Sequence, residues 1–361
     1  MTDYRAPDAS RAEKGSYAFY EDILQGEAGW IAGLQFESGA IPTYGAPVDR
    51  YGGKYRVVPY FTHLALLGLL ERPEHAPVVR GYMDWYFAHL NRSSAETAPD
   101  GSVYDYTVET DRLTETATGD FDSTDSYAST FLNVLRKYAV TTGDIAYLQA
   151  HRDDIALIAG AMIATKQEDG LTWAKPDHRV KYLMDNAEVY EGLGDMEWIS
   201  GAVYGDEEEA AVYRRHKEEV LAGIQGELWN ESKQAYAYAK AEDGSLLQPD
   251  WDRFYPDATA QLFPVWTGVL APDSGRARHL YDTFNSHHSG WPELRIRDSF
   301  PWALLAYTAA IMRDRDRSDL FLQSVKAAYA DRGRPWPWYV MESGVTMLTA
   351  ARLQSLTDDV L

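Results

Sequence analysis

The sequence predicts an all-helical fold, an (α/α)6 toroid of six helical hairpins with short strands in the loops of one rim. Apolar residues recur at helical spacing in about twelve segments. Short polar turns alternate with longer loops rich in Gly, Pro and aromatic residues as the connections between these segments. Amphipathic segments alternate in the same way with segments that are apolar on most sides, which indicates outer helices wrapped around a buried inner ring.

The short junctions share one pattern, an apolar helix end, a small or turn residue, an acid and then an amphipathic helix. TTGDIAYL and VYGDEEEA are two examples. Aspartate is a favoured N-cap, so each junction predicts the start of an outer helix. The outer helices are expected to begin near Ser16, His75, Ile145, Asp206, Ser274 and Arg317. The inner helices are expected to begin near Val57, Ser123, Asp185, Pro256, Ser299 and Glu342.

The long loops contain the fragments DGSVYDY, DGLTWA and QAYAYAKAEDG, which are typical of short strands or hairpins. Each fragment lies between the end of an outer helix and the start of an inner helix, so all of them fall on one rim. Functional sites gather on the loops of a rigid scaffold, which makes this rim the predicted site. No linker or composition break interrupts the pattern. One domain is therefore expected over residues 1–361, with 1–14 as an extended or flexible segment.

Composition excludes several classes of function. The chain has 361 residues, 45% of them hydrophobic, which is enough for a large core. A formal charge of -21 opposes binding to nucleic acid and to acidic lipid surfaces. The absence of cysteine excludes disulfides, thiolate metal sites and a cysteine nucleophile. No dinucleotide, P-loop or zinc-protease motif is present, so neither a metal nor a cofactor is expected. No leader-like or membrane-spanning apolar run is present, so a cytoplasmic location is expected.

Acidic residues stand where the inner helices are expected to begin. They are Asp122 and Asp125 in GDFDSTDSYAS, Asp185 and Glu188 in YLMDNAEVYEG, and Asp257, Asp298 and Glu342. Each suits a helix cap, but in a toroid all of these starts converge on one cavity. Glycoside hydrolysis needs two facing carboxyl groups. Asp125 and Asp185 occupy similar positions on neighbouring inner helices and are the predicted catalytic pair, with Asp122 and Glu37 as substitutes.

Aromatic and basic side chains crowd the same loops. Flat rings stack on the apolar faces of sugars, which predicts an oligosaccharide as the partner. The basic side chains either bind an anionic group of that sugar or pair with neighbouring acids. The expected substrate-binding residues are Tyr44, Tyr55, Arg56, Trp173, His178, Arg179, Tyr182, Trp251, Tyr255, Asp257, Trp291, Trp336, Trp338 and Glu342.

The helix alternation, together with PYFTHLALLGLLE, DSTDSYASTFL, TGDIAYL and FYPDATAQLFPV, resembles the six-hairpin glycosidase superfamily over essentially the whole chain. The resemblance implies an (α/α)6 barrel and glycoside hydrolase activity. In this superfamily, unsaturated uronyl hydrolases place two aspartates at the starts of the fourth and sixth helices, and Asp125 and Asp185 match those positions. Endoglucanases of this fold place a catalytic glutamate at the start of the second helix, where this chain reads GGKYRVVPY without an acid.

Three other functions stay open on the same toroid. A sugar 2-epimerase needs histidines that move a proton next to a carbonyl, and His63 and His178 are the candidates. A polyuronide lyase needs a tyrosine base and a group that neutralises a carboxylate, for which Tyr182, Asn186 and Arg179 are available. The last alternative is a sugar-binding protein without catalysis.

Overall fold

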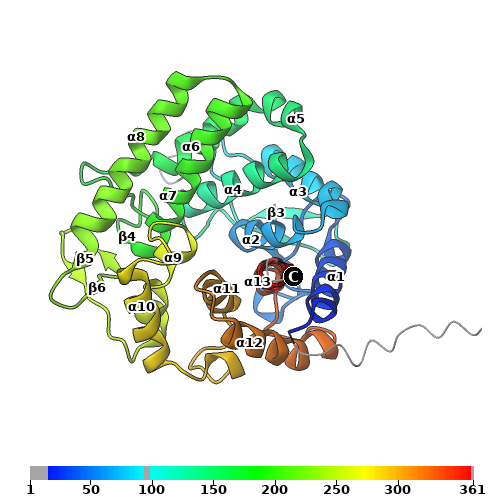
Figure 1. Cartoon of the computed structure of the whole chain (residues 1–361). Helices are drawn as coiled ribbons and strands as arrows, with labels where there is room; N and C mark the ends of the chain where they lie inside the picture. Colours follow the sequence, from blue (N-terminus) through cyan, green and yellow to red (C-terminus); the bar gives the residue numbers. More distant parts are fainter. Residues whose placement is uncertain (1–14, 93–97, 359–361) are drawn as a thin grey trace, which may run out of the picture.

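The computed structural model describes residues 15–92 and 98–358, so the predicted extended segment 1–14 lies outside the described residues. The described residues form a double ring of helices (Figure 1). The inner helices are α2 (Pro59–Leu69), α4 (Thr124–Thr142), α7 (Leu183–Trp198), α9 (Phe263–Trp266), α11 (Ala303–Ile311) and α13 (Val340–Asp358). Each inner helix contacts the next one along the chain, and α13 contacts α2, which closes the ring.

The outer helices surround this ring. They are α1 (Tyr17–Leu34), α3 (Ala76–Ala88), α5 (Ile145–Ala150), α6 (Arg152–Ile163), α8 (Glu207–Gly223), α10 (Gly275–His287) and α12 (Arg315–Ala328). Helix α1 packs on α13, α6 on α4, α8 on α7 and α12 on α11, so outer helices cover inner ones (Figure 1). Helices α5 and α6 follow one another between α4 and α7 and together form one outer member, so six outer members surround six inner helices and the predicted (α/α)6 toroid is confirmed.

The predicted junctions act as helix caps. The side chains of Asp144, Asp206 and Asp314 each accept a hydrogen bond from a backbone N–H in the first turn of α5, α8 and α12. The helix expected near Pro256 differs most from its prediction, because a π-helical turn at Phe254–Ala258 is followed by the four-residue α9. Pro264 lacks an N–H and is tolerated only in the first turn of a helix, so the two pieces do not form one continuous helix.

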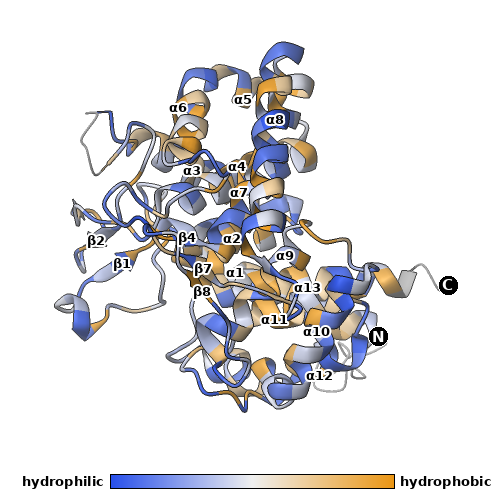
Figure 2. Cartoon of the chain, turned by 90° about the vertical axis from the view of Figure 1, so that its left-hand side faces the viewer, coloured by the Kyte–Doolittle hydropathy of each residue, from blue (hydrophilic) through white to orange (hydrophobic). Residues whose placement is uncertain are grey.

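The strands lie in the loops that lead from outer helices into inner ones, as predicted. Strands β1 (Tyr55–Val57), β2 (Tyr106–Val108) and β3 (Glu115–Ala117) form one antiparallel sheet. The others are β4 (Lys181–Tyr182), β5 (Trp229–Asn230), β6 (Ala235–Tyr236), β7 (Ala239–Lys240) and β8 (Leu246–Leu247). Figure 2 shows β1 and β2 gathered at one side of the helical ring. No described helix is long and apolar enough to cross a membrane.

Close backbone contact sets the orientation of two inner helices. Gly68 of α2 lies against Gly344 of α13, and a Cβ atom on Gly68 would stand 2.0 Å from the carbonyl oxygen of Gly344. Only glycine allows this approach, because any side chain would force the two backbones apart. Packing of this kind fixes how far each helix is turned about its own axis. That rotation decides which residues of its first turn face the centre of the ring.

Candidate active site

A cavity of about 450 Å³ opens at the end of the ring where the inner helices begin. All six inner helices contribute side chains to its wall, at or near their first turns. Six carboxyl groups line it, those of Asp105, Asp122, Asp185, Glu188, Asp298 and Glu342. Aromatic side chains form much of the remaining wall, namely Tyr51, Tyr60, Phe61, Tyr127, Tyr255, Phe263, Phe300, Trp302 and Tyr339. Carboxyl groups beside aromatic rings in a concave site are the features that a sugar-cleaving enzyme requires.

Two of these acids stand one turn apart on α7. Burial raises the pKa of Asp185 well above its ordinary value, and the nearby carboxyl groups of Asp125, Glu188 and Asp122 raise it further. Burial also raises the pKa of Glu188, which accepts a 2.6 Å hydrogen bond from the Tyr60 hydroxyl. Among the described residues, no side chain donates a hydrogen bond to Asp185. Asp185 thus faces the cavity, and its surroundings favour the protonated form of its carboxyl group over the ionised form.

Glu342 lies on the wall of the cavity opposite Asp185, in the first turn of α13. In the order of the closed inner ring, α13 is three places from α7, so the two helices face each other across the centre. Each oxygen of Glu342 accepts a backbone hydrogen bond at the start of α11, from Trp302 at 3.1 Å and from Ala303 at 2.6 Å. Burial raises the pKa of Glu342 to about 7, against the lowering effect of these two bonds. The bonds fix the carboxylate in one orientation.

Asp105 and Arg56 form an ion pair in the cavity wall at 2.8 Å. Tyr127 donates a 2.9 Å hydrogen bond to the other oxygen of Asp105. Burial raises the pKa of Asp105 to about 6, although Arg56 and Tyr127 act in the opposite direction. Through these two contacts Asp105 holds β1 against α4.

The structure places Asp125 behind the cavity wall. Its side chain is fully buried at the start of α4 and is not among the residues that line the cavity. One oxygen accepts a hydrogen bond from the Ser126 backbone at 2.8 Å, and the other lies 2.6 Å from the Thr172 hydroxyl. Burial raises the pKa of Asp125 to about 7. This carboxyl group joins α4 to the loop before α7.

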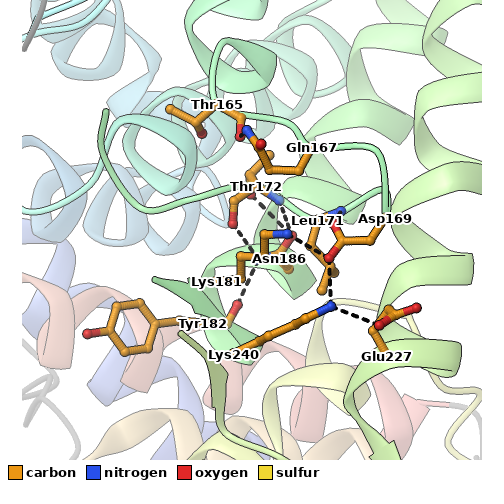
Figure 3. A network of polar contacts seen from close by, with 10 residues as sticks. All are labelled: Thr165, Gln167, Asp169, Leu171, Thr172, Lys181, Tyr182, Asn186, Glu227 and Lys240. Carbon is orange, nitrogen blue, oxygen red and sulfur yellow. Dashed lines mark hydrogen bonds and ion pairs between the residues drawn. The ribbon is translucent and has the colours of Figure 1, made fainter. Parts of the chain in front are cut away.

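Figure 3 shows the polar network around that loop. Asn186 of α7 accepts from the Thr172 N–H at 2.8 Å and donates to the carbonyl oxygens of Thr172 and Tyr182. Asp169 accepts from Lys181 at 2.6 Å and from Lys240 at 2.9 Å. These contacts hold the first turn of α7 in place, and with it Asp185.

Asp125 is expected to make the protein less stable as the pH rises from about 4 to about 7. Its pKa of about 7 in the folded chain exceeds the ordinary value of 3.8. Between these values the folded state binds a proton that the unfolded chain has lost, so the free energy of unfolding falls by up to about 1.4 kcal/mol per pH unit. Urea unfolding at about pH 5 and about pH 7 measures this slope.

The variant Asp125→Asn is expected to flatten the slope. In the wild type the Thr172 hydroxyl donates to one oxygen of Asp125 and the Ser126 backbone N–H donates to the other. Asparagine has nearly the same shape, accepts from Ser126 through its oxygen and donates from its amide to the Thr172 oxygen, but it has no proton to lose. Asp177→Asn, at an exposed position, is the matched control and leaves the slope as it is. An unchanged slope in Asp125→Asn would show that Asp125 is ionised in the folded protein.

The structure brings together five of the residues predicted for the site. Asp122, Asp185, Arg56, Tyr255 and Glu342 line the cavity. Glu37 is exposed and lies outside the lining residues. Tyr44, Trp336 and Trp338 line a second cavity beside the first.

The remaining predicted binding residues lie elsewhere. Trp291 is fully buried in the core, and Tyr55 packs edge-on against Phe36. Asp257 is buried and accepts a hydrogen bond from the Asp250 backbone at 3.0 Å. The rest stand in the rim loops outside both cavities, namely Trp173, His178, Arg179, Tyr182 and Trp251.

The basic side chains of the rim mostly have acidic partners. Five basic side chains of the rim form ion pairs, Lys54 with Glu109, Lys175 with Asp120, Arg179 with Glu242, Lys181 with Asp169 and Arg334 with Glu27. Arg56 is the one basic residue among the described residues of the cavity wall, and Asp105 neutralises it. The cavity therefore carries a strong excess of carboxyl groups.

Sequence reasoning missed several residues of the cavity wall. Tyr60 and Tyr127 were unassigned, although both stand in the first turn of an inner helix, as the predicted acids do. Asp105 lies in the fragment DGSVYDY, which indicated only a strand. A position in the first turn of an inner helix thus indicates a residue of the cavity wall better than an acidic side chain alone does.

The candidate histidines for an epimerase lie outside the cavity. His63 is buried between aromatic rings and contacts the Thr130 hydroxyl at 2.9 Å, and burial lowers its pKa well below the ordinary value. His178 is exposed beside the Tyr182 hydroxyl. None of the described residues that line the cavity is a histidine.

Comparison with solved structures finds the same architecture in glycosidases. A glycosidase in complex with glucose superposes with a TM-score of 0.67 at 13% identity, over 95% of this chain and 99% of its own. An alpha-mannanase of family GH76 from Bacteroides thetaiotaomicron gives 0.63 at 11% identity, over 94% and 97%. A rhamnosidase from Klebsiella oxytoca with rhamnose bound gives 0.58 at 14% identity, over 94% and 64%.

No family model and no curated protein matches the sequence. The likeness to solved structures at these identities establishes the fold. The chain has the six-hairpin (α/α)6 architecture of these glycosidases.

Proposed function

We propose that the protein is a glycoside hydrolase that cleaves a neutral oligosaccharide by two-carboxylate acid/base catalysis. The observation that carries the proposal is the pair formed by Asp185 and Glu342, which stand on opposite inner helices across an aromatic cavity. Asp185 keeps its proton because burial and neighbouring acids raise its pKa. Glu342 is oriented by two backbone N–H groups. The fold shared with glycosidases supports the same reaction class.

In the proposed reaction, Asp185 donates its proton to the glycosidic oxygen as the bond from that oxygen to the anomeric carbon breaks. Glu342 accepts a proton from a water molecule, whose oxygen forms the new bond to the anomeric carbon. The products are two shorter sugars, with Asp185 ionised and Glu342 protonated until solvent resets both. A single displacement by this activated water inverts the configuration at the anomeric carbon.

This assignment replaces the predicted partner Asp125 with Glu342. Asp125 is fully buried and does not line the cavity, whereas Glu342 does, so Asp125 reaches neither a sugar nor a water molecule there. The neutral substrate follows from charge. Arg56 is the one basic side chain among the described residues of the cavity wall, and Asp105 neutralises it, so a uronate or a sulfated sugar finds no available cationic partner there.

The test is a panel of neutral and uronate-containing oligosaccharides, assayed for newly released reducing ends. Neutral substrates are expected to be cleaved, and proton NMR during the first turnovers is expected to show the inverted anomer. Release of unsaturated uronates would instead identify a lyase, and exchange of a carbon-bound proton with deuterated solvent without cleavage would identify an epimerase. Either result would overturn the proposal.

A further inference from the structure

A second cavity of about 640 Å³ lies beside the catalytic one. We name it the indole cavity, after Trp30, Trp336 and Trp338, which line it together with Tyr44, Arg50 and Arg334. Trp30 belongs to α1, and the other residues come from the loop before β1 and the loop before α13. The proposed hydrolysis uses none of these side chains.

The indole cavity presents aromatic surface to solvent. The Trp336 side chain is 54% exposed, although it is one of the largest apolar groups of the chain. Its ring contacts Tyr44 at a centroid distance of 5.0 Å. Half-buried Trp30 lies between Gly45, where an added Cβ atom would stand 3.4 Å from the indole ring, and the Arg334 guanidinium group, which is 5.6 Å from the ring centroid. Exposed aromatic surface in a concave site commonly marks a binding site.

Arg50 supplies hydrogen-bond donors beside these rings. Its guanidinium group lies 4.7 Å from the Tyr51 ring centroid and 5.4 Å from that of Trp336. The Arg50 side chain makes one long hydrogen bond, 3.4 Å to the Tyr44 hydroxyl. Arg50 forms no ion pair with any acid among the described residues. Arg334 in the same cavity is paired with Glu27 at 2.9 Å. Arg50 therefore has N–H groups available for the hydroxyl oxygens of a ligand stacked on the indoles.

The two cavities share a wall of aromatic side chains. Trp336 of the indole cavity contacts Phe300 of the catalytic cavity at 5.9 Å between ring centroids. Tyr44 contacts Tyr339 of the catalytic cavity at the same distance. A ligand that extends from the catalytic cavity over Phe300 therefore reaches Trp336. Sugar chains are long, flexible and amphipathic, and they fit a row of rings of this kind.

We propose that the indole cavity binds distal sugar units of the oligosaccharide whose scissile bond lies in the catalytic cavity. The inference rests on the proposed hydrolase function and adds a chain-length preference to it. Trp336 and Trp30 are the stacking surfaces, and Arg50 donates to the sugar hydroxyl groups. Long substrates gain contacts that a disaccharide does not reach, so they are cleaved with higher kcat/KM.

The experiment measures kcat/KM for a disaccharide and for a hexasaccharide of the same linkage. Trp336→Ala is expected to lower kcat/KM for the hexasaccharide by about tenfold, the loss typical of an aromatic anchor, and to leave the disaccharide unchanged. Trp336→Phe restores part of the loss because a ring remains. Trp229→Ala, at a half-buried indole outside both cavities, is the control. Equal effects on both substrates, or no effect on either, would overturn the proposal.

Binding separates this inference from the proposed reaction. Calorimetric titration of Asp185→Asn with the hexasaccharide detects the complex without turnover. If the wild type cleaves no oligosaccharide but the hexasaccharide binds and Trp336→Ala abolishes binding, the indole cavity stands and the hydrolase proposal falls. The indole cavity is not a sugar site if the hexasaccharide binds equally well to Asp185→Asn and to the double variant that also carries Trp336→Ala. The same conclusion follows if the hexasaccharide does not bind at all.

Discussion

Replacing Asp185 by asparagine is expected to lower kcat/KM by about 10²- to 10⁴-fold, the usual contribution of a general acid. Asparagine has nearly the same shape but carries no proton that the leaving oxygen can take. The raised pKa of Asp185 comes from burial and from like charges, a cost that an amide avoids, so the variant is expected to be at least as stable as the wild type. Reducing-end release measures the activity, and urea unfolding measures the stability.

Two matched variants make this result specific. Asp177→Asn changes an exposed carboxyl group on the same rim and is expected to keep full activity. An activated substrate, whose leaving group departs without a proton, is expected to recover much of the lost rate in Asp185→Asn. If Asp185→Asn is fully active and Glu188→Gln is inactive, the acid is the neighbouring carboxyl group one turn further along α7, and the assignment of Asp185 is wrong.

Replacing Glu342 by glutamine is expected to lower kcat by about 10²- to 10⁴-fold, because no group remains to take the proton of the attacking water. The wild-type enzyme is expected to lose kcat/KM about tenfold per pH unit below about pH 7. The reason is the pKa of Glu342, which is about 7, so at lower pH the group is protonated and cannot act as a base. The residual activity of Glu342→Gln is expected to lack this limb.

Glu168→Gln serves as the matched control, since Glu168 is exposed in a rim loop outside the cavity. Its pH profile and kcat are expected to match those of the wild type. An acidic limb that survives in Glu342→Gln would assign the limb to another acid of the cavity wall, with Asp105, whose pKa is about 6, as the remaining candidate. Retention of configuration in the product would likewise contradict a base that acts on water.

The ring of helices could be predicted from the sequence because the patterns that indicate it are local. Helical periodicity, the acid that caps each outer helix and the alternation of amphipathic with apolar segments are properties of neighbouring residues. Asp144, Asp206 and Asp314 cap their helices as their junctions predict. The position of the elaborate loops follows from the same alternation, because every loop into an inner helix opens on one rim.

The contacts between side chains were harder to predict from the sequence than the helices were. Trp291 and Trp336 stand in similar aromatic loops, but one is fully buried in the core and the other is largely exposed. A loop sequence does not reveal which element will cover it. The same applies to the basic residues, because Arg179 and Glu242 are far apart in the chain and meet only after the loops fold.

The sequence by itself thus determined the toroid, its rim and the acids at the starts of the inner helices. Only the tertiary structure decided which of those acids face the cavity. Asp125 and Asp185 occupy equivalent places in the sequence pattern, but α4 turns Asp125 toward Thr172 while α7 turns Asp185 toward the centre. The physical reason is that the rotation of a helix about its axis is set by how its residues pack against those of its neighbours, as where Gly192 of α7 lies against Ser129 of α4, and these contacts exist only in the folded chain.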